Sequence, residues 1–163
     1  MQSAPRTIII MGVSGCGKTL IGKKIAAALG GIFEDADDFH SAANKAKMTA
    51  SIPLTDEDRW PWMHTLRARI EEMRGCTTCY VLACSALKQS YRDILSGDGT
   101  IFIYLKGTRE VIASRLDARK GHYMPANLLD SQFSTLEEPQ NAITIDVSST
   151  PEQIVAKALQ RLE

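Results

Sequence analysis

The chain has 163 residues, a length typical of one domain whose single core buries about two thirds of the unfolded surface. Its 19 basic side chains balance 19 acidic ones and no basic block stands out, which argues against nucleic acid or a membrane surface as a partner. No apolar run reaches the roughly 18 residues that span a bilayer, and no signal-peptide core opens the chain. We therefore expect a cytoplasmic protein with a small-molecule partner.

A phosphate-binding loop follows the first predicted strand. Residues 7–11 form a buried apolar strand, and residues 12–19 match the pattern G-x-x-x-x-G-K-[ST] in full. Glycines let backbone N–H groups converge on phosphate oxygens, and the helix predicted over residues 18–29 points its N-terminus at the same place. The residues that we expect to bind ATP are Gly12, Val13, Ser14, Gly15, Cys16, Gly17, Lys18 and Thr19. Lys18 would reach the β- and γ-phosphates, and Thr19 would bind Mg²⁺. The alternative is a glycine-rich turn that matches by chance.

An acidic cluster closes the second predicted strand, which begins at Ile32. Asp35 and Asp37 are alternate residues, so on an extended segment both carboxylates would face the γ-phosphate. One would hold Mg²⁺ through water and the other would accept the proton of an attacking hydroxyl. The third predicted strand is followed directly by Ser85 rather than by an acid, so the metal ligand and the base must come from elsewhere. The alternative is a solvated turn rich in Asp.

The rest of the chain alternates helices with strands. Residues 41–50 predict a short polar helix, and Thr55 caps a long helix with an acidic first turn. That helix carries Trp62, Leu66, Ile70 and Met73 at helical spacing, so we expect these side chains to pack in the core rather than to contact a cofactor. Three further apolar strands, each followed by a helix, are predicted over residues 80–84, 101–105 and 143–147. The pattern predicts an α/β fold, with a five-stranded parallel sheet and helices on both faces, in a single domain over residues 1–163.

An excursion between the last two strands, at about residues 115–135, is typical of a lid. It carries Arg115 and Arg119 at helical spacing, followed by a possible hinge at Gly121. A lid of this kind would close over a bound nucleotide. The alternative is a solvated basic helix end.

The four cysteines include Cys76 and Cys79, which are separated by two residues. A zinc site needs a second such pair or histidines at matching spacing, and the sequence has neither. We therefore expect four reduced thiols, as is usual inside cells.

Together these motifs resemble the gluconate kinase (gluconokinase) family over nearly the whole chain. The segments that carry the resemblance are residues 12–19 and 35–40, Asn44 with Lys47-Met48, residues 52–59 with Pro61-Trp62, Cys84-Ser85-Ala86-Leu87-Lys88 with Tyr91-Arg92-Asp93, and Gly121-His122 with Gln132-Phe133. The stretch from Cys84 to Lys88 is far more specific than the phosphate loop. The departures from the family pattern are small: Ala36, where Gly also occurs, and Ser41, where Pro is frequent.

The resemblance implies that ATP, with Mg²⁺, phosphorylates D-gluconate to 6-phospho-D-gluconate on a P-loop kinase fold with a helical lid. It also implies a homodimer that feeds the pentose phosphate route. The residues implied in catalysis are Lys18, Asp35, Asp37 and Arg119, with Thr19 and Asp35 at the metal. Arg115 and Arg119 resemble lid arginines that bind ATP near its adenine and its phosphates. The residues implied at the substrate are Asp37, His40, Arg59, Lys88, Arg92 and Gln132.

The chemistry of the substrate fits Arg59 independently of the family. A sugar acid offers one carboxylate, which a planar guanidinium binds with two parallel hydrogen bonds. With the carboxylate held at the far end, the primary hydroxyl would point at the γ-phosphate. Arg59 follows the acidic start of the long helix and suits this role.

Two alternatives to this function stay open. Shikimate kinase shares the loop, the acidic pair and an arginine near this position, but a glycine triplet is expected where Cys84-Ser85-Ala86 stands. A nucleotide-dependent switch or an ATPase regulator without a small substrate is the alternative from another class. Its guanine-specific form is disfavoured because Lys47 stands where an N-K-x-D motif has Asp. Release of ADP that depends on the added substrate would separate these functions.

Overall fold

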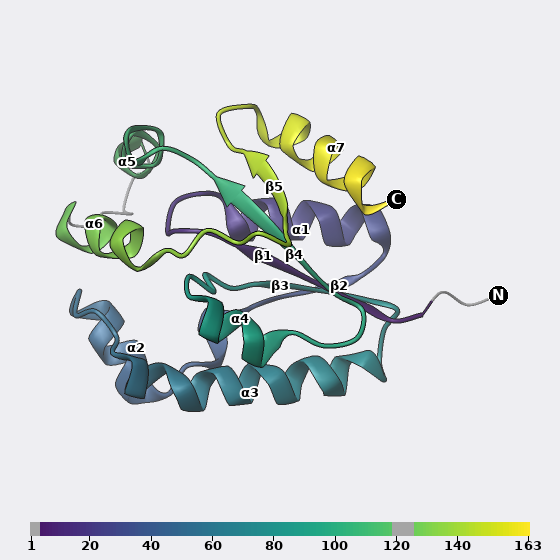
Figure 1. Ribbon diagram of the computed structural model, residues 1–163, viewed down its shortest axis with the longest axis horizontal. Helices are drawn as coiled ribbons and strands as arrows, with labels where there is room; N and C mark the ends of the chain where they lie inside the picture. Colours follow the sequence, from purple (N-terminus) through teal and green to yellow (C-terminus); the bar gives the residue numbers. More distant parts are fainter. Residues whose placement is uncertain (1–3, 119–125) are drawn as a thin grey trace.

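The computed structural model describes residues 4–118 and 126–163, which form a parallel sheet between two layers of helices (Figure 1). The strands are β1 (Arg6–Met11), β2 (Ile32–Asp35), β3 (Cys79–Ala83), β4 (Thr100–Lys106) and β5 (Ile143–Asp146). The helices are α1 (Lys18–Leu29), α2 (Ala42–Thr49), α3 (Asp56–Arg74), α4 (Gln89–Leu95), α5 (Arg109–Ala118), α6 (Ala126–Thr135) and α7 (Pro151–Leu162), with a 3₁₀ turn, η1 (Ala36–Phe39), after β2.

The central strand of the sheet is β1. The strand order is β2-β3-β1-β4-β5 and all neighbours run parallel, with Ile8 opposite both Val81 and Ile101. After β1 the chain forms β2 and β3, which lie on one side of β1 within the sheet, and it then forms β4 and β5 on the other side. The strand order therefore changes direction at the carboxyl end of β1. Open parallel sheets bind their ligands at such a point, and here the phosphate loop occupies it. The predicted α/β fold with five parallel strands is confirmed.

Each face of the sheet has its own apolar core, as expected for parallel strands that are covered on both sides. Ile8 and Ile10 pack in the core that contains residues of α1, α5 and α7, whereas Ile9 and Met11 pack in the core that contains residues of α3 and α4. In Figure 1, α1 and α7 lie above the sheet and α3 and α4 lie below it. The predicted inward residues of α3 are all buried: Trp62, Leu66, Ile70 and Met73.

Helix α3 begins directly after its predicted cap, Thr55, and α2 begins one residue later than predicted, with Ser41 as its cap. The Ser41 hydroxyl accepts the N–H of Asn44 at the start of α2. Thr55 and Asp58 form a capping box at the start of α3, in which each side chain accepts the backbone N–H of the other residue. These caps fix the entry points of two helices that border the site described below.

Residues 85–88 connect β3 to the helix that the sequence predicts after it. They form a loop in which Ala86 has a φ of 44°, and α4 begins only at Gln89. The reason is Arg92, whose guanidinium Nη1 donates to the carbonyls of Ala86 at 2.7 Å and Leu87 at 3.1 Å. Because these carbonyls point at the guanidinium, they do not align along a helix axis. The preceding strand, β3, also starts and ends one residue earlier than predicted.

All four cysteines are free thiols, as predicted, and three of them are buried: Cys16, Cys79 and Cys84. Within residues 4–118 and 126–163, none of the helices combines the length and the apolar character needed to cross a membrane.

Candidate active site

A cavity of about 500 Å³ opens at the carboxyl ends of β1, β2 and β3. Its walls come from the phosphate loop, from the start of η1, from the loop between α2 and α3, from the loop after β3 and from α6. The predicted site residues that line it are Ser14, Gly15, Gly17, Lys18, Thr19, Asp35, Asp37, His40, Arg59 and Gln132. A volume of this size is ordinary for a small-molecule site. The fold therefore brings most of the predicted residues into one cavity.

The phosphate loop is built from backbone geometry that needs glycine. Gly15 and Gly17 have φ values of 85° and 100°, and a Cβ on Gly12 would lie 2.9 Å from the carbonyl oxygen of Leu105. Lys18 Nζ donates to the carbonyls of Gly12 and Val13, at 3.0 and 3.1 Å, so its ammonium group lies within the curve of the loop. This arrangement places a cation and the N-terminus of α1 at one point, which suits a polyphosphate.

The acidic pair reaches the cavity by a geometry other than the predicted one. Asp35 ends β2, but Asp37 lies in η1, so the extended segment that was expected to align the two carboxylates is absent from this stretch. Instead, one carboxylate oxygen of Asp35 accepts the backbone N–H of Asp37 at 2.9 Å and thereby caps η1. The other oxygen accepts the Thr19 hydroxyl at 3.0 Å. Asp35 is thus held toward the phosphate loop, beside Thr19.

Asp37 faces the cavity with 64% of its side-chain surface accessible. Its pKa is raised above the usual range, chiefly because the surrounding protein reduces its hydration and secondarily because Asp35 is close; the charge of Lys18 opposes this shift. A carboxylate with a raised pKa is a stronger base than an ordinary one. Since Asp35 uses both oxygens in contacts with the protein, Asp37 is the carboxylate of the pair that is better placed to accept a proton.

His40 is buried in the cavity wall, and its ring stacks on Trp62 with the ring centroids 3.9 Å apart. Its Nδ1 contacts the side-chain amide nitrogen of Asn44 at 3.2 Å, and its Nε2 lies 3.8 Å from an oxygen of Asp37. Burial, together with the charges of Arg59 and Lys45, lowers the pKa of His40 to about 4. The ring is therefore neutral near neutral pH.

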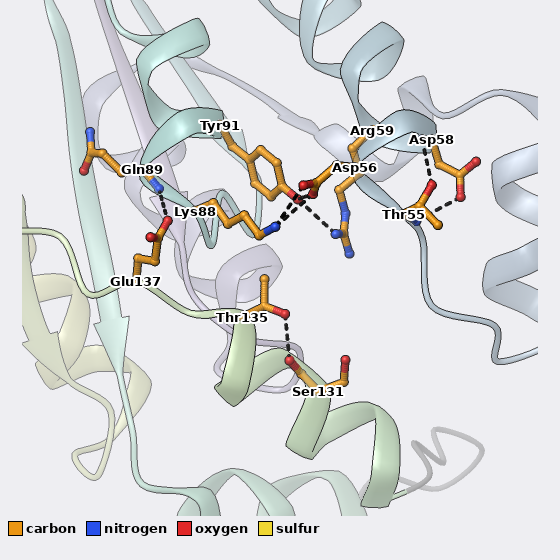
Figure 2. Close-up of polar contacts among 10 residues, drawn as sticks. All are labelled: Thr55, Asp56, Asp58, Arg59, Lys88, Gln89, Tyr91, Ser131, Thr135 and Glu137. Carbon is orange, nitrogen blue, oxygen red and sulfur yellow. Dashed lines mark hydrogen bonds and ion pairs between the residues drawn. The ribbon is translucent and has the colours of Figure 1, made fainter.

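Arg59 is held by a network that joins α3 to α4 (Figure 2). Its guanidinium donates to the Tyr91 hydroxyl at 3.1 Å, and that hydroxyl donates in turn to Asp56. Lys88 Nζ contacts both oxygens of Asp56 at 3.0 Å. The hydrogen bond from Tyr91 has the largest effect in lowering the pKa of Asp56, and the bonds from Lys88 lower it further. Asp56 and Tyr91 have no role in the site predicted from the sequence, although both belong to segments that carry the family resemblance.

Two predicted substrate residues are placed differently from the rest. Lys88 is outside the set that lines the cavity, and its ammonium pairs with Asp56. Arg92 is 3% exposed, and besides Ala86 and Leu87 it donates to the carbonyl of Glu137 at 2.7 Å. Its guanidinium is therefore buried outside the cavity lining, where it braces the loop after β3 against the segment after α6. The family resemblance implies that Arg92 contacts the sugar acid or a phosphate, and this role stays a prediction.

The two described site residues of the predicted lid, Gln132 and Arg115, contact different parts of the protein. Gln132, on α6, accepts the backbone N–H of Ser14 at 2.6 Å and donates to its hydroxyl at 2.9 Å, so it binds the phosphate loop. Arg115, on α5, donates to the carbonyls of Val147 and Ser149 in the loop after β5. Arg119 and the motif residues Gly121 and His122 lie outside the described residues.

Cys84 and Trp62, both largely buried, also line the cavity. Burial raises the pKa of Cys84 to about 12, so this thiol stays protonated and is no nucleophile at neutral pH. Trp62 was predicted to serve packing alone. It does belong to the core under α3, but its indole N–H also donates to the carbonyl of Ala36 at 2.8 Å and supports η1.

Comparison with known proteins agrees with this geometry. The family model described as shikimate kinase matches residues 14–163. The thermosensitive gluconokinase of Escherichia coli K12 is 45% identical over 151 residues, which cover 89% of this chain and 81% of that protein. The crystal structure of a gluconokinase from Sinorhizobium meliloti superimposes with a TM-score of 0.86 at 42% identity, covering 99% of this chain and 95% of that one.

The likeness to shikimate kinase itself concerns the fold alone. The structure of shikimate kinase from Aquifex aeolicus covers 96% of this chain and 95% of its own, with a TM-score of 0.58 at 12% identity. The specific motifs, the sequence identities and the superposition all agree on one family. The chain is therefore a member of the gluconokinase family, built on a fold that it shares with shikimate kinase.

Proposed function

We infer that the protein is a gluconokinase, which transfers the γ-phosphoryl group of ATP to the 6-hydroxyl of D-gluconate and releases ADP and 6-phospho-D-gluconate. The observation that carries this inference is the cavity that joins the phosphate loop and the acidic pair to Arg59. ATP phosphates would bind at the loop, and the carboxylate of gluconate would bind at Arg59. The primary hydroxyl at the other end of the sugar acid would then face the γ-phosphate beside Asp37.

Asp37 is the proposed base. In the transfer, the hydroxyl oxygen forms a bond to the γ-phosphorus while the bond to the bridging oxygen of ADP breaks, and the hydroxyl proton passes to Asp37. Lys18 would stabilise the charge that develops on the phosphate oxygens. Arg119 and Arg115 are proposed to contribute from the lid over residues 115–135 of a single kinase domain.

A magnesium ion fits between Thr19 and Asp35. The hydroxyl and the carboxylate are 3.0 Å apart at the mouth of the phosphate loop, and both offer oxygen, the donor that Mg²⁺ prefers. No group of three or more metal-ligating side chains exists in the described part of the chain, so phosphate oxygens and water would complete the coordination. When bound, Mg²⁺ supplies charge neutralisation at the β- and γ-phosphates.

Phosphorylation of shikimate is the second candidate, since the shikimate kinase model matches residues 14–163. A panel that measures ADP release with gluconate, its epimers, shikimate or no added substrate distinguishes the possibilities. We expect release with gluconate that far exceeds the release with shikimate. Release that is equal with and without any substrate would instead indicate an ATPase regulator.

The resemblance to gluconate kinases also motivates three further proposals: a homodimer, a cytoplasmic location and a supply of product to the pentose phosphate route. Sedimentation velocity of the purified protein at several concentrations tests the first. A single species at the mass of one 17.9 kDa chain would contradict it.

A further inference from the structure

The position of the His40 ring is fixed by its neighbours. Its side chain is 2% exposed, and the ring lies on the indole of Trp62 at an angle of 18° between the planes. The indole N–H of Trp62 donates to Ala36 in η1, one residue before Asp37. The ring, its support and the acidic turn therefore form one packed unit, in which the imidazole cannot reorient without disturbing the core below.

The orientation of the Asn44 side-chain amide follows from its second contact. Asn44 is 6% exposed, and its amide nitrogen lies 2.8 Å from the backbone carbonyl oxygen of Asp58. A carbonyl oxygen only accepts hydrogen bonds, so the amide atom facing it must be the NH₂ group rather than the oxygen. The same NH₂ group lies 3.2 Å from His40 Nδ1. One of its hydrogens thus goes to Asp58 and the other goes to the imidazole.

This donor determines the tautomer of His40. Because Asn44 donates to Nδ1, that nitrogen is an acceptor and carries no proton, and the single proton of the neutral ring is on Nε2. The Nε2–H group lies on the side of Asp37, 3.8 Å from its nearest carboxylate oxygen. The other charged groups that act on the ring are Arg59 and Lys45, both of which disfavour a second proton on it.

We propose that Asn44 is a positioning residue for phosphoryl transfer: it holds His40 as the Nε2–H tautomer, so that this N–H donates to one oxygen of Asp37 and leaves the other oxygen to accept the substrate proton. The distance of 3.8 Å shortens to a hydrogen bond when the sugar acid fills the cavity, as is common for contacts of this kind in enzymes without substrate. The assignment of the tautomer stands on contacts alone, whereas its role in turnover rests on the proposed function.

The tautomer is measured directly by long-range ¹H–¹⁵N correlation NMR on the full ¹⁵N-labelled chain. The chain has three histidines, and His40→Gln identifies the signals of His40 by their loss. We expect a protonated Nε2 and an unprotonated Nδ1 in the wild type near neutral pH. In Asn44→Asp the new carboxylate accepts rather than donates, so Nδ1 gains a proton. A wild-type ring with its proton on Nδ1, or an Asn44→Asp spectrum identical to the wild type, overturns the proposal.

Kinetics test the consequence for turnover. Asn44→Asp should lower kcat by about ten- to a hundredfold, as expected for a misplaced reacting group, with the KM for ATP within about twofold of wild type. Thr49→Ala, which removes an exposed polar side chain from the same helix, is the matched control and should leave kcat unchanged. An unchanged kcat in a folded Asn44→Asp protein, checked by thermal melting, contradicts the positioning role.

A conservative pair of substitutions at His40 keeps the test decisive even where Asn44→Asp fails to fold. Glutamine carries an amide N–H near the place of Nε2, whereas asparagine carries one near the place of Nδ1. His40→Gln should therefore retain several times more kcat than His40→Asn. Equal losses in the two variants would overturn the donor role of Nε2–H. Failure of the wild type to phosphorylate gluconate would instead refute the proposed function, while the NMR measurement would still test the tautomer.

Discussion

The two ends of the cavity are constructed from different parts of the protein. The proposed phosphate end comes from eight consecutive residues, whose glycines and backbone N–H groups would do most of the binding, with Lys18 as the main charged side chain. The proposed sugar-acid end lies at Arg59 of α3, which is held from behind the cavity wall by a network with Asp56, Lys88 and, on α4, Tyr91 (Figure 2). The loop has one main charged side chain, Lys18, whereas the network spreads its contacts over four side chains. Substitutions at the two ends should therefore differ in size and in the substrate that they affect.

The largest effect is expected for Lys18→Ala at the phosphate end. The lysine is partly exposed in the loop and is no part of the core, so the variant should fold while phosphoryl transfer falls by orders of magnitude, about a thousandfold or more. Single-turnover kinetics with saturating ATP, beside a thermal melt, measure both quantities. Normal turnover of gluconate by this variant would show that the phosphate-loop assignment is wrong.

The acidic pair links the two ends of the cavity, and substitutions of Asp35 and Asp37 should have different effects. Asp37→Asn keeps the shape but cannot accept the proton, so kcat should fall about 10²- to 10⁴-fold while ATP binding stays near normal. Asp35→Asn should in addition raise the Mg²⁺ concentration needed for half-maximal rate, because Asp35 lies beside Thr19. Magnesium titrations of both variants make the comparison. Full kcat in Asp37→Asn would favour Asp38, or direct transfer of the proton to the γ-phosphate.

The acidic pair also predicts how the kcat of the wild-type protein depends on pH. The base must be deprotonated to act, and the pKa of Asp37 is raised above its usual value by reduced hydration and by Asp35. Activity should therefore fall as the pH decreases through that raised pKa, at a pH higher than an ordinary Asp would give. A profile of kcat against pH shows this acidic limb, and Asp37→Asn should lack it. An identical limb in the variant would assign it to another group.

The two arginines that are proposed to bind the substrates sharpen the contrast between the ends. Arg59→Ala should raise the KM for gluconate by about ten- to a hundredfold, the loss expected for a hydrogen-bonded charge, with less effect on ATP. Arg115→Ala should weaken ATP binding more than gluconate binding, since Arg115 is proposed to contact the nucleotide under the lid. Steady-state kinetics with each substrate varied in turn distinguish the two. Equal or reversed effects would mean that the sites are exchanged.

The smallest effect is expected within the network itself. Tyr91→Phe removes the hydroxyl that links Arg59 to Asp56 but leaves the ring that packs under Arg59. The hydroxyl links two charged side chains, but Arg59 itself stays in place in the variant, so the KM for gluconate should rise only about two- to tenfold, which corresponds to about 0.4–1.4 kcal/mol. The KM for ATP serves as the internal control. A change as large as that of Arg59→Ala would show that the network acts as one unit rather than as separable contacts.

Features that depend on neighbours in the chain were predictable from the sequence. The phosphate loop requires glycine at fixed positions, the caps at Ser41 and Thr55 act within four residues, and apolar strands that alternate with helices imply the parallel sheet. Each of these follows from backbone geometry over a short stretch. Even the predicted core face of α3 follows from helical spacing alone.

Features that depend on distant side chains were decided by the tertiary structure. Asp35 and Asp37 meet the cavity through a 3₁₀ turn, which the sequence pattern presented as an extended segment. The family resemblance implied that Arg92 contacts an anion, but in the folded protein its guanidinium is buried against the carbonyls of residues 86, 87 and 137. The tautomer of His40 depends on an amide that is itself oriented by a carbonyl in another helix. The energy of such contacts depends on burial and on exact partners, which only the packed fold brings together.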